Sequence, residues 1–419
     1  MRSSNTSTPK HARKSTGSTG SGAGAAKTQR AAASSNSGTR AGTGARTGTG
    51  SGKHSVSAKS GRRRKRSAKR TDGKHRFPRW KRALILIGVI LIAGVIGLHL
   101  YTHPSQVDST GYKHASQFGN TIVLNGIDVS YAQGSKINWN KVKRNGVDFV
   151  FIRAGYRDST DGKIHKDSQF RKNIRRAKRA GLMVGVYFYS QATTKSEAAK
   201  EARTLLRWVK GYDIDLPLVI DYEILENGRL HQFLSKDSYT KTKGTEIVKR
   251  FCEVIRNAGY EPGVYSNYDL LTGKLNSKEL AKNAHIWVAH YDSSTDYPNK
   301  YEFWQASNQA TISGVKGDAD RNFWYFYKGG MTTYGKRNVN AKSLKHCTIK
   351  LKKHSFYLVG RKVEPSLTVK YGKKTLTEGK DYRLSYVKNA SAGYAYAVVT
   401  GLGNYKDMKL TRFRIKTVL

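Results

Sequence analysis

The chain of 419 residues has few cysteines, methionines and prolines for its length, with 2, 4 and 7 respectively. Its cysteines, Cys252 and Cys347, fall in segments that look like different domains. We therefore exclude a scaffold held together by disulfides and expect each cysteine to be an unpaired buried thiol. The pattern also offers no ligand set for a structural zinc ion, and we expect neither a metal nor a cofactor. Stability must then come from a packed core.

Acidic residues are also scarce, since 29 Asp and Glu face 76 Lys and Arg and leave a formal charge of +47. The first of them is Asp72, and residues 1–82 otherwise consist mainly of Ser, Thr, Gly, Ala, Lys and Arg. Such a segment cannot bury enough apolar surface to fold, so we predict a disordered basic tail. The tail lacks interleaved aromatic residues, so anionic lipids are its expected contact, with non-specific nucleic acid as the alternative.

Formal charge is absent from residues 83–101, ALILIGVILIAGVIGLHLY, which are long enough to cross a bilayer as one helix. Basic clusters at 61–70 and 79–82 precede this segment and predict a cytoplasmic N-terminus. We therefore expect a single-pass membrane protein whose remaining residues lie outside the cell, beginning with a linker at 102–121. A cleaved secretory signal is the alternative, although its charged leader is usually only a few residues long.

Residues 122–328 alternate between short apolar runs and helical segments. The helical segments cover 168–181, 194–211 and 242–259, and they end on glycine after basic residues in the last turn. The apolar runs cover 122–130, 147–155, 182–190, 216–223, 261–267, 285–291, 302–307 and 321–326. Strands that alternate with helices predict a parallel sheet of the α/β class, and about eight strands fit a closed (β/α) barrel. The last connections are too short for full helices, so we predict an irregular barrel.

Four acids lie at or near the ends of these runs. The stretch LPLVIDYEIL (216–225) holds Asp221 and Glu223, which point to the same face because they are two positions apart in a strand. Asp128 ends the first run, and Asp320 precedes the last. Side chains at the carboxyl ends of barrel strands form the active face of such folds, so we expect all four to converge there. The alternative is that each acid caps a helix or faces solvent.

These motifs also carry a resemblance to a known family. GIDVSYAQGSKINW, FVFIRAGY, LPLVIDYE, GVYSN, IWVAHY, FWQAS and DADRNFW are similar, in order, to motifs of glycoside hydrolase family 25, the muramidase-type lysozymes. The resemblance implies cleavage of the β-1,4 bond between N-acetylmuramic acid and N-acetylglucosamine in the glycan strands of peptidoglycan. It also implies that Glu223 is the proton donor and that Asp128, Asp221 and Asp320 are its companion acids.

The chemistry of the pair agrees with these roles, because glycoside hydrolysis needs one neutral acid and one negative group. Two carboxyls on one strand leave little room for the water that an inverting enzyme holds between them. We therefore favour retention, with the substrate's 2-acetamido group attacking and Asp221 orienting it. Inversion with Asp128 or Asp320 as base stays open, as does an inactive protein that only binds the wall.

Aromatic side chains near the same strand ends suit a sugar site, because they offer flat apolar faces and polar tips. The candidates for substrate binding are Tyr187, Tyr189, Trp287, Tyr291 and Trp304. Trp287 and Tyr291 share one strand face and rank together. Arg153 follows an apolar strand, and we expect it to pair with Asp128 or another acid.

A polar linker at 329–346 leads to a second pattern at 347–419. Short alternating runs separated by Gly, Asn and Lys turns predict a small β-sandwich without helices. The stretch LTEGKDYRLSYVKNASAGYAYAVVTGLGNYKD is similar to immunoglobulin-like modules of bacterial surface proteins. Such a module either binds wall polymer or acts as a spacer.

Overall fold

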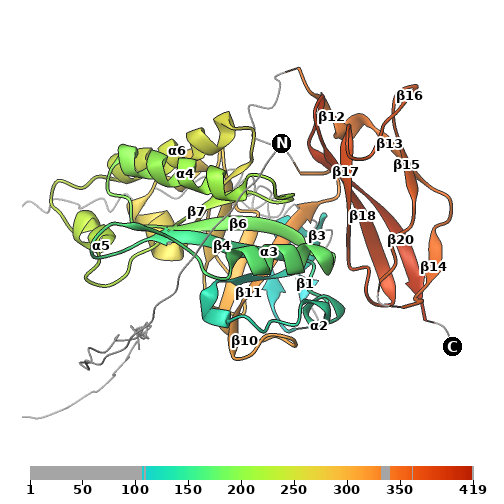
Figure 1. Cartoon of the computed structure of the whole chain (residues 1–419), viewed down its shortest axis with the longest axis horizontal. Coiled ribbons are helices and arrows are strands. Elements are labelled where there is room, and N and C mark those ends of the chain that lie inside the picture. Colours follow the sequence, from blue (N-terminus) through green and yellow to red (C-terminus); the bar gives the residue numbers. More distant parts are fainter. Residues whose placement is uncertain (1–105, 108–109, 332–339, 361, 418–419) are drawn as a thin grey trace, which may run out of the picture. The chain divides into compact units, whose positions relative to one another are not determined.

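The computed structural model describes residues 106–107, 110–331, 340–360 and 362–417 (Figure 1). The predicted basic tail at 1–82 and the predicted span at 83–101 lie outside these residues. Within the described part of the chain, no helix is both long and apolar enough to cross a bilayer.

Eight strands close into a barrel, as the alternation predicted. The ring closes because β3 pairs with β4 as well as with β11. A further strand, β5 (Ile164–Lys166), pairs with the last three residues of β4. In ring order the barrel strands are β3 (Thr121–Val129), β4 (Phe149–Arg157), β6 (Met183–Ser190), β7 (Leu218–Tyr222), β8 (Pro262–Asn267), β9 (His285–Ala289), β10 (Phe303–Thr311) and β11 (Asp318–Tyr327).

One strand of the barrel departs from the predicted parallel arrangement. Strand β11 runs antiparallel to both of its neighbours, β10 and β3, whereas the other neighbouring pairs of the ring are parallel. The connection between β10 and β11 is a short turn without a helix, and so short a link joins antiparallel strands only. The first residues of β11 therefore lie at the same end of the barrel as the last residues of β3.

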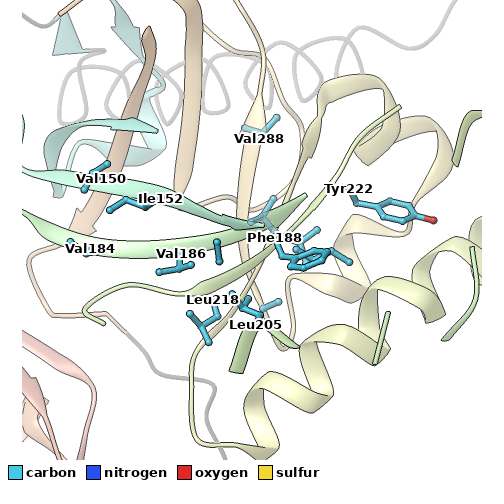
Figure 2. Close-up of a cluster of buried hydrophobic side chains, with 14 of the residues drawn as sticks. Val150, Ile152, Val184, Val186, Phe188, Leu205, Leu218, Tyr222 and Val288 are labelled. Carbon is cyan, nitrogen blue, oxygen red and sulfur yellow. The ribbon is translucent and has the colours of Figure 1, made fainter. Parts of the chain in front are cut away.

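Alternation along each strand divides the apolar side chains between two cores. Outward residues of β4, β6 and β7 pack under the helices, and Figure 2 shows Val186, Phe188 and Leu218 beside Leu205 of a covering helix. Inward residues fill the barrel, where the rings of Phe149 and Phe151 occupy the space beside two glycines. A Cβ on Gly126 or Gly185 would lie 2.2 Å from one of those rings, so the interior has no room for a larger residue there.

The three predicted helices cover the outside of β4, β6, β7 and β8 (Figure 1). Thr194 and Thr240 cap two of them by accepting a hydrogen bond from the backbone N–H three residues on. The predicted helices are α3 (Phe170–Arg179), α4 (Lys195–Val209) and α6 (Lys241–Asn257). Shorter ones that we did not predict are α2 (Trp139–Arg144), α5 (Arg229–Leu234), α7 (Ser277–Leu280), η1 (Ser116–Phe118), η2 (Tyr131–Gln133), η3 (Leu270–Lys274) and η4 (Leu344–His346).

The late connections confirm the prediction of an irregular barrel. Between β8 and β9 the chain forms only the single turns η3 and α7, and no described helix lies between β9 and β10. This side of the barrel is covered instead by the segment before β3, in which β1 (Gln106–Val107) pairs with β2 (Lys113–His114). His114 lies against Trp304 and Phe323, so the preceding segment completes the core there.

The C-terminal residues form a small β module with two main sheets, consistent with the predicted β-sandwich. One sheet is β14 (Ser355–Tyr357), β20 (Met408–Lys416), β18 (Gly393–Gly401) and β17 (Tyr382–Val387), and the other is β13 (Thr348–Leu351), β15 (Leu367–Tyr371) and β16 (Lys374–Thr375). A short pair joins β12 (Lys342–Ser343) to β19 (Tyr405–Lys406). Cys252 and Cys347 are both buried and unpaired, as expected.

The β module packs against the barrel at the end opposite the four predicted acids. Val387, Val398 and Met408 of the module belong to the same apolar cluster as Ile122 and Phe326 of the barrel. These two barrel residues lie at the start of β3 and the end of β11, which is the floor of the barrel. The module therefore closes the floor and does not reach the mouth.

Candidate active site

The four predicted acids meet at the mouth of the barrel. Register pairs Asp320 with Asp128 across β11 and β3, while Asp221 lies on β7 with Glu223 one residue beyond the strand end. The negative charges of Glu223, Asp128 and Asp320 all raise the pKa of Asp221, so the four groups are electrostatic neighbours. The sequence prediction of convergence is therefore matched by the geometry.

Asp128 is held by a network of amide and hydroxyl groups. Its Oδ2 accepts hydrogen bonds from Gln305 Nε2 at 2.7 Å and Asn322 Nδ2 at 2.9 Å. Gln305 Oε1 in turn accepts from the hydroxyls of Tyr265 and Tyr291 at 2.8 and 2.9 Å. Both amides donate an N–H to this oxygen, so they position the carboxyl with Oδ2 as an acceptor.

Asp221 is the most isolated acid of the group. It is 5% exposed, and its Oδ1 is buried without a hydrogen-bond partner among the described atoms. Burial, followed by the charges of Glu223 and Asp128, raises the pKa of Asp221 well above its ordinary value, and Arg153 opposes this shift. The Asp221 and Glu223 pair therefore retains a proton at a pH where two exposed carboxyls would both be ionised.

This raised pKa predicts that Asp221→Asn stabilises the fold at neutral pH. The unfolded chain loses the proton near the ordinary pKa of 3.8, whereas the folded chain keeps it, so stability falls as pH rises from there through the raised pKa. Asparagine cannot ionise and removes this loss. We expect a gain of about 0.5–2 kcal/mol at pH 7, or about 2–4 °C in Tm per kcal/mol. Thermal unfolding between pH 4 and 8 checks this, and a gain that does not grow with pH would contradict it.

Glu223 is half-buried and stands closer to solvent than Asp221. Three hydrogen bonds fix the backbone around it. Gln191 Nε2 donates to the carbonyl of Glu223 at 3.0 Å, Ser266 Oγ donates to that of Tyr222 at 2.6 Å, and the Tyr222 hydroxyl donates to that of Ala192 at 3.2 Å. These bonds hold the backbone of the acid pair in place where the chain leaves β7.

Arg153 places a cation near the acids, where its charge opposes the rise in the pKa of Asp221. Its Nε lies 2.9 Å from Asp167 Oδ2, and its guanidinium lies 4.9 Å from the ring centre of Tyr131. The backbone N–H of Tyr131 also donates to Asp167 Oδ2 at 3.0 Å. The expected pairing with an acid is confirmed, and the partner is Asp167. This pair ties the loop after β3 to β4 beside the acids.

Three of the five predicted aromatic residues lie under or beside the acids. Trp287 is 2% exposed, stacks on Phe151 at 4.4 Å between ring centres, and donates its indole N–H to Asn322 Oδ1. The rings of Tyr187 and Trp287 pack edge to face, and both lie inside the barrel beneath the carboxyls. Register pairs Tyr189 with Asp221 across β6 and β7, and burial and the charges of Glu223 and Asp221 raise the pKa of Tyr189.

The other two aromatic residues differ sharply in position. Tyr291 is 49% exposed and lines a cleft of about 420 Å³ with Tyr112, Asp292 and Asn308. Trp304 is fully buried in the outer core and donates its indole N–H to the carbonyl of His290. Its strand neighbours in the sequence face inward, so residue 304 faces outward. The structure therefore does not bring Trp304 to the mouth, contrary to its prediction as a substrate contact.

Two polar residues of the site were not singled out from the sequence. Gln305 and Asn322 bind Asp128 from β10 and β11, and they lie within the quoted motifs FWQAS and DADRNFW. The signal that could have found them is a lone amide inside an otherwise apolar run, because a buried amide needs partners.

Comparison with known proteins agrees with this site. The family model described as glycosyl hydrolases family 25 matches residues 127–315. Lysozyme M1 of Streptomyces globisporus is 31% identical over 210 residues, which cover 48% of this chain and 67% of that protein. The chain belongs to glycosyl hydrolase family 25. The match to the family model includes Asp128 and the Asp221–Glu223 pair and ends five residues before Asp320.

Other lysozymes match over a similar region. The autolytic lysozyme of Clostridium acetobutylicum is 29% identical over 198 residues, which cover 47% of this chain and 54% of that protein. This chain therefore spans about half the length of that relative. A solved structure of a bacterial lysozyme from Streptomyces coelicolor is 25% identical, with a TM-score of 0.39, over 48% of this chain and 91% of that one.

Proposed function

We propose that the protein is a peptidoglycan hydrolase that cleaves the β-1,4 bond between N-acetylmuramic acid and N-acetylglucosamine. The observation that carries this proposal is the Asp221–Glu223 pair at the barrel mouth, where burial and neighbouring charge keep a proton on carboxyl groups. Glycoside hydrolysis needs such a proton beside a negative group. Membership of family 25 and the lysozyme names of the relatives support the same activity.

In this mechanism the pair shares one proton, and Glu223 delivers it. Glu223 is the donor because it is half-buried and closer to the opening, whereas Asp221 is 5% exposed. With the proton on Glu223, the Asp221 carboxylate accepts the N–H of the substrate's 2-acetamido group. The acetamido oxygen then bonds to the anomeric carbon as the glycosidic bond breaks, and the leaving oxygen takes the proton from Glu223.

The second half of the reaction restores the enzyme. Glu223, now ionised, takes a proton from water as that water opens the cyclic intermediate, so the new hydroxyl stands on the original face. This route predicts net retention. Asp128 is held in place by Gln305 and Asn322, and its negative charge stabilises the cation that develops at the anomeric carbon. Inversion would instead assign the base role to Asp128 or Asp320.

We further propose that residues 83–101 anchor the protein in the cell membrane, with residues 1–82 in the cytoplasm and the barrel outside. The supporting observations are the apolar run and the basic clusters that precede it. In this proposal the C-terminal β module, which is similar to immunoglobulin-like modules, acts as a structural support for the barrel.

Purified cell walls test the proposal against an inactive wall-binding protein. The full-length enzyme should lower the turbidity of a wall suspension, and the first product should carry the β configuration by proton magnetic resonance. Binding without clearing would overturn the enzymatic proposal. Clearing with an initial α product would keep the activity but assign the base role to Asp128 or Asp320.

A further inference from the structure

Helix α3 has an outer face that carries only cations. Its buried residues Phe170, Asn173, Ile174 and Ala177 point to the core, and the opposite face is exposed. We define the α3 cation face as the exposed residues Arg171, Lys172, Arg175, Arg176 and Arg179, together with Lys136 of the neighbouring loop. Because a helix repeats every 3.6 residues, these helical cations form rows at i and i+4.

Charges on this face are not balanced by neighbouring acids. Rows such as Arg171, Arg175 and Arg179 place like charges one turn apart, which destabilises a helix by about 0.2–0.5 kcal/mol per pair. Within the described residues, the α3 cation face makes no ion pair, whereas the surfaces of α4 and α6 carry Lys195–Glu246, Lys249–Glu279 and Arg250–Glu253. An external anion would supply the missing countercharge.

A cleft lies at one end of this face, away from the catalytic acids. It has a volume of about 690 Å³ and is lined by Ser135, Lys136, Ile137, Asn138, Trp139, Asn140, Arg176, Arg179 and Ala180. No carboxylate lines it. Trp139 is 4% exposed, and its indole N–H has no acceptor among the described atoms. The cleft thus combines three cations with neutral donors, which is the chemistry of an anion site.

We propose that the α3 cation face and its cleft bind an extended phosphodiester polymer of the cell wall. This inference rests on the proposed function, because a wall hydrolase works among the anionic polymers attached to its substrate. The regularly spaced cations of the α3 cation face can contact several phosphates of an extended chain at once, whereas a single small anion would contact only a few of them.

Two other polyanions fit the surface less well. Single-stranded nucleic acid is usually held by exposed aromatic side chains, and among the described residues none of the exposed large apolar side chains lies on α3 or lines the cleft. A helix that lies on a membrane inserts its apolar face, but the apolar face of α3 is fully used in the core, where Phe170, Ile174 and Ala177 are 0% exposed.

Binding of full-length protein to synthetic poly(glycerol phosphate) tests the proposal without relying on catalysis. The cleft variant Lys136→Gln, Arg176→Gln, Arg179→Gln should bind about tenfold or more weakly. The logarithmic salt dependence of its affinity should also fall by about 2, since three phosphate contacts are lost. The matched control is Lys200→Gln, Arg203→Gln, Lys210→Gln, which removes the same charge from exposed positions at α4. Both variants keep the basic tail, so a difference between their affinities is due to the cleft residues.

Wall binding supplies the second arm. Hydrofluoric acid removes phosphodiester polymers from walls, so the control should bind native walls more tightly than treated walls, and this preference should be clearly smaller for the cleft variant. Both should release reducing ends from treated walls at equal rates, and absence of that activity would concern the proposed function alone. Equal binding of poly(glycerol phosphate) by both variants would overturn the inference. A defect seen only with poly(U) RNA or with phosphatidylglycerol vesicles would assign the face to nucleic acid or membrane and would also overturn it.

Discussion

Glu223→Gln should lower the rate of wall hydrolysis by about 10²–10⁴-fold while leaving the fold and sugar binding intact. The glutamine keeps the size of the side chain but cannot give a proton to the leaving oxygen. Glu223 lies one residue beyond β7, and its backbone carbonyl accepts from Gln191 whatever the side chain is. The change therefore removes the proton donor and leaves the structure intact. The rate of wall hydrolysis is measured as the release of reducing ends from purified walls.

Glu226→Gln is the matched control for this change. Glu226 is an exposed acid three residues farther along the same connection, and it is not one of the mouth carboxyls. Its variant should retain activity close to that of the native chain. A folded Glu223→Gln enzyme with near-native turnover, as judged with circular dichroism, would remove the catalytic assignment of Glu223.

Asp215→Ala should destabilise the folded chain by about 1–3 kcal/mol, because it leaves a buried backbone donor unsatisfied. The Asp215 side chain is fully buried at the contact between barrel and β module, where it accepts from the backbone N–H of Val184 at 2.8 Å. It also lies 2.7 Å from Lys178 Nζ and 3.2 Å from Arg383 Nε of β17. Alanine would leave the buried amide of Val184 without its acceptor, while Lys178 and Arg383 would keep the half-exposed carboxylate of Asp213 as a partner.

Asp213→Ala gives the control, because Asp213 pairs with the same two cations from a half-exposed position. Its side chain is 50% exposed, so solvent screens the pairs and their loss should cost less than about 1 kcal/mol. Urea unfolding of both variants measures the difference. Equal losses would mean that the β module is not held to the barrel through Asp215.

Much of the barrel could be predicted because its strands are short, apolar and punctuated by polar segments. The acids were also predictable, since Asp221 and Glu223 are conspicuous within an apolar run and strand geometry puts them on one face. Convergence with Asp128 and Asp320 followed from the rule that the carboxyl ends of parallel strands form one face. Asp320 reaches that face by a different route, because it lies at the start of the antiparallel strand β11.

The features that escaped prediction depend on contacts between distant residues. A strand buried on both faces gives no periodic signal, so the sequence did not tell that Gln305 faces the acids while Trp304 faces the outer core. Arg153 had several possible acid partners, and the fold selected Asp167. Docking of the β module on the barrel floor rests on Val387, Val398 and Met408, whose pattern alone shows only that they belong to some core.

Identification of the new reducing end in digested peptidoglycan tests the central claim most directly. Walls digested with the full-length enzyme are reduced with borohydride, hydrolysed and analysed for amino sugar alcohols, with the Glu223→Gln variant as the blank. Cleavage at the bond proposed here should convert muramic acid to its alcohol, in an amount that grows with digestion and is absent from the blank. Accumulation of glucosaminitol instead would contradict the account, because it would mean that the enzyme cuts on the other side of the glucosamine residue.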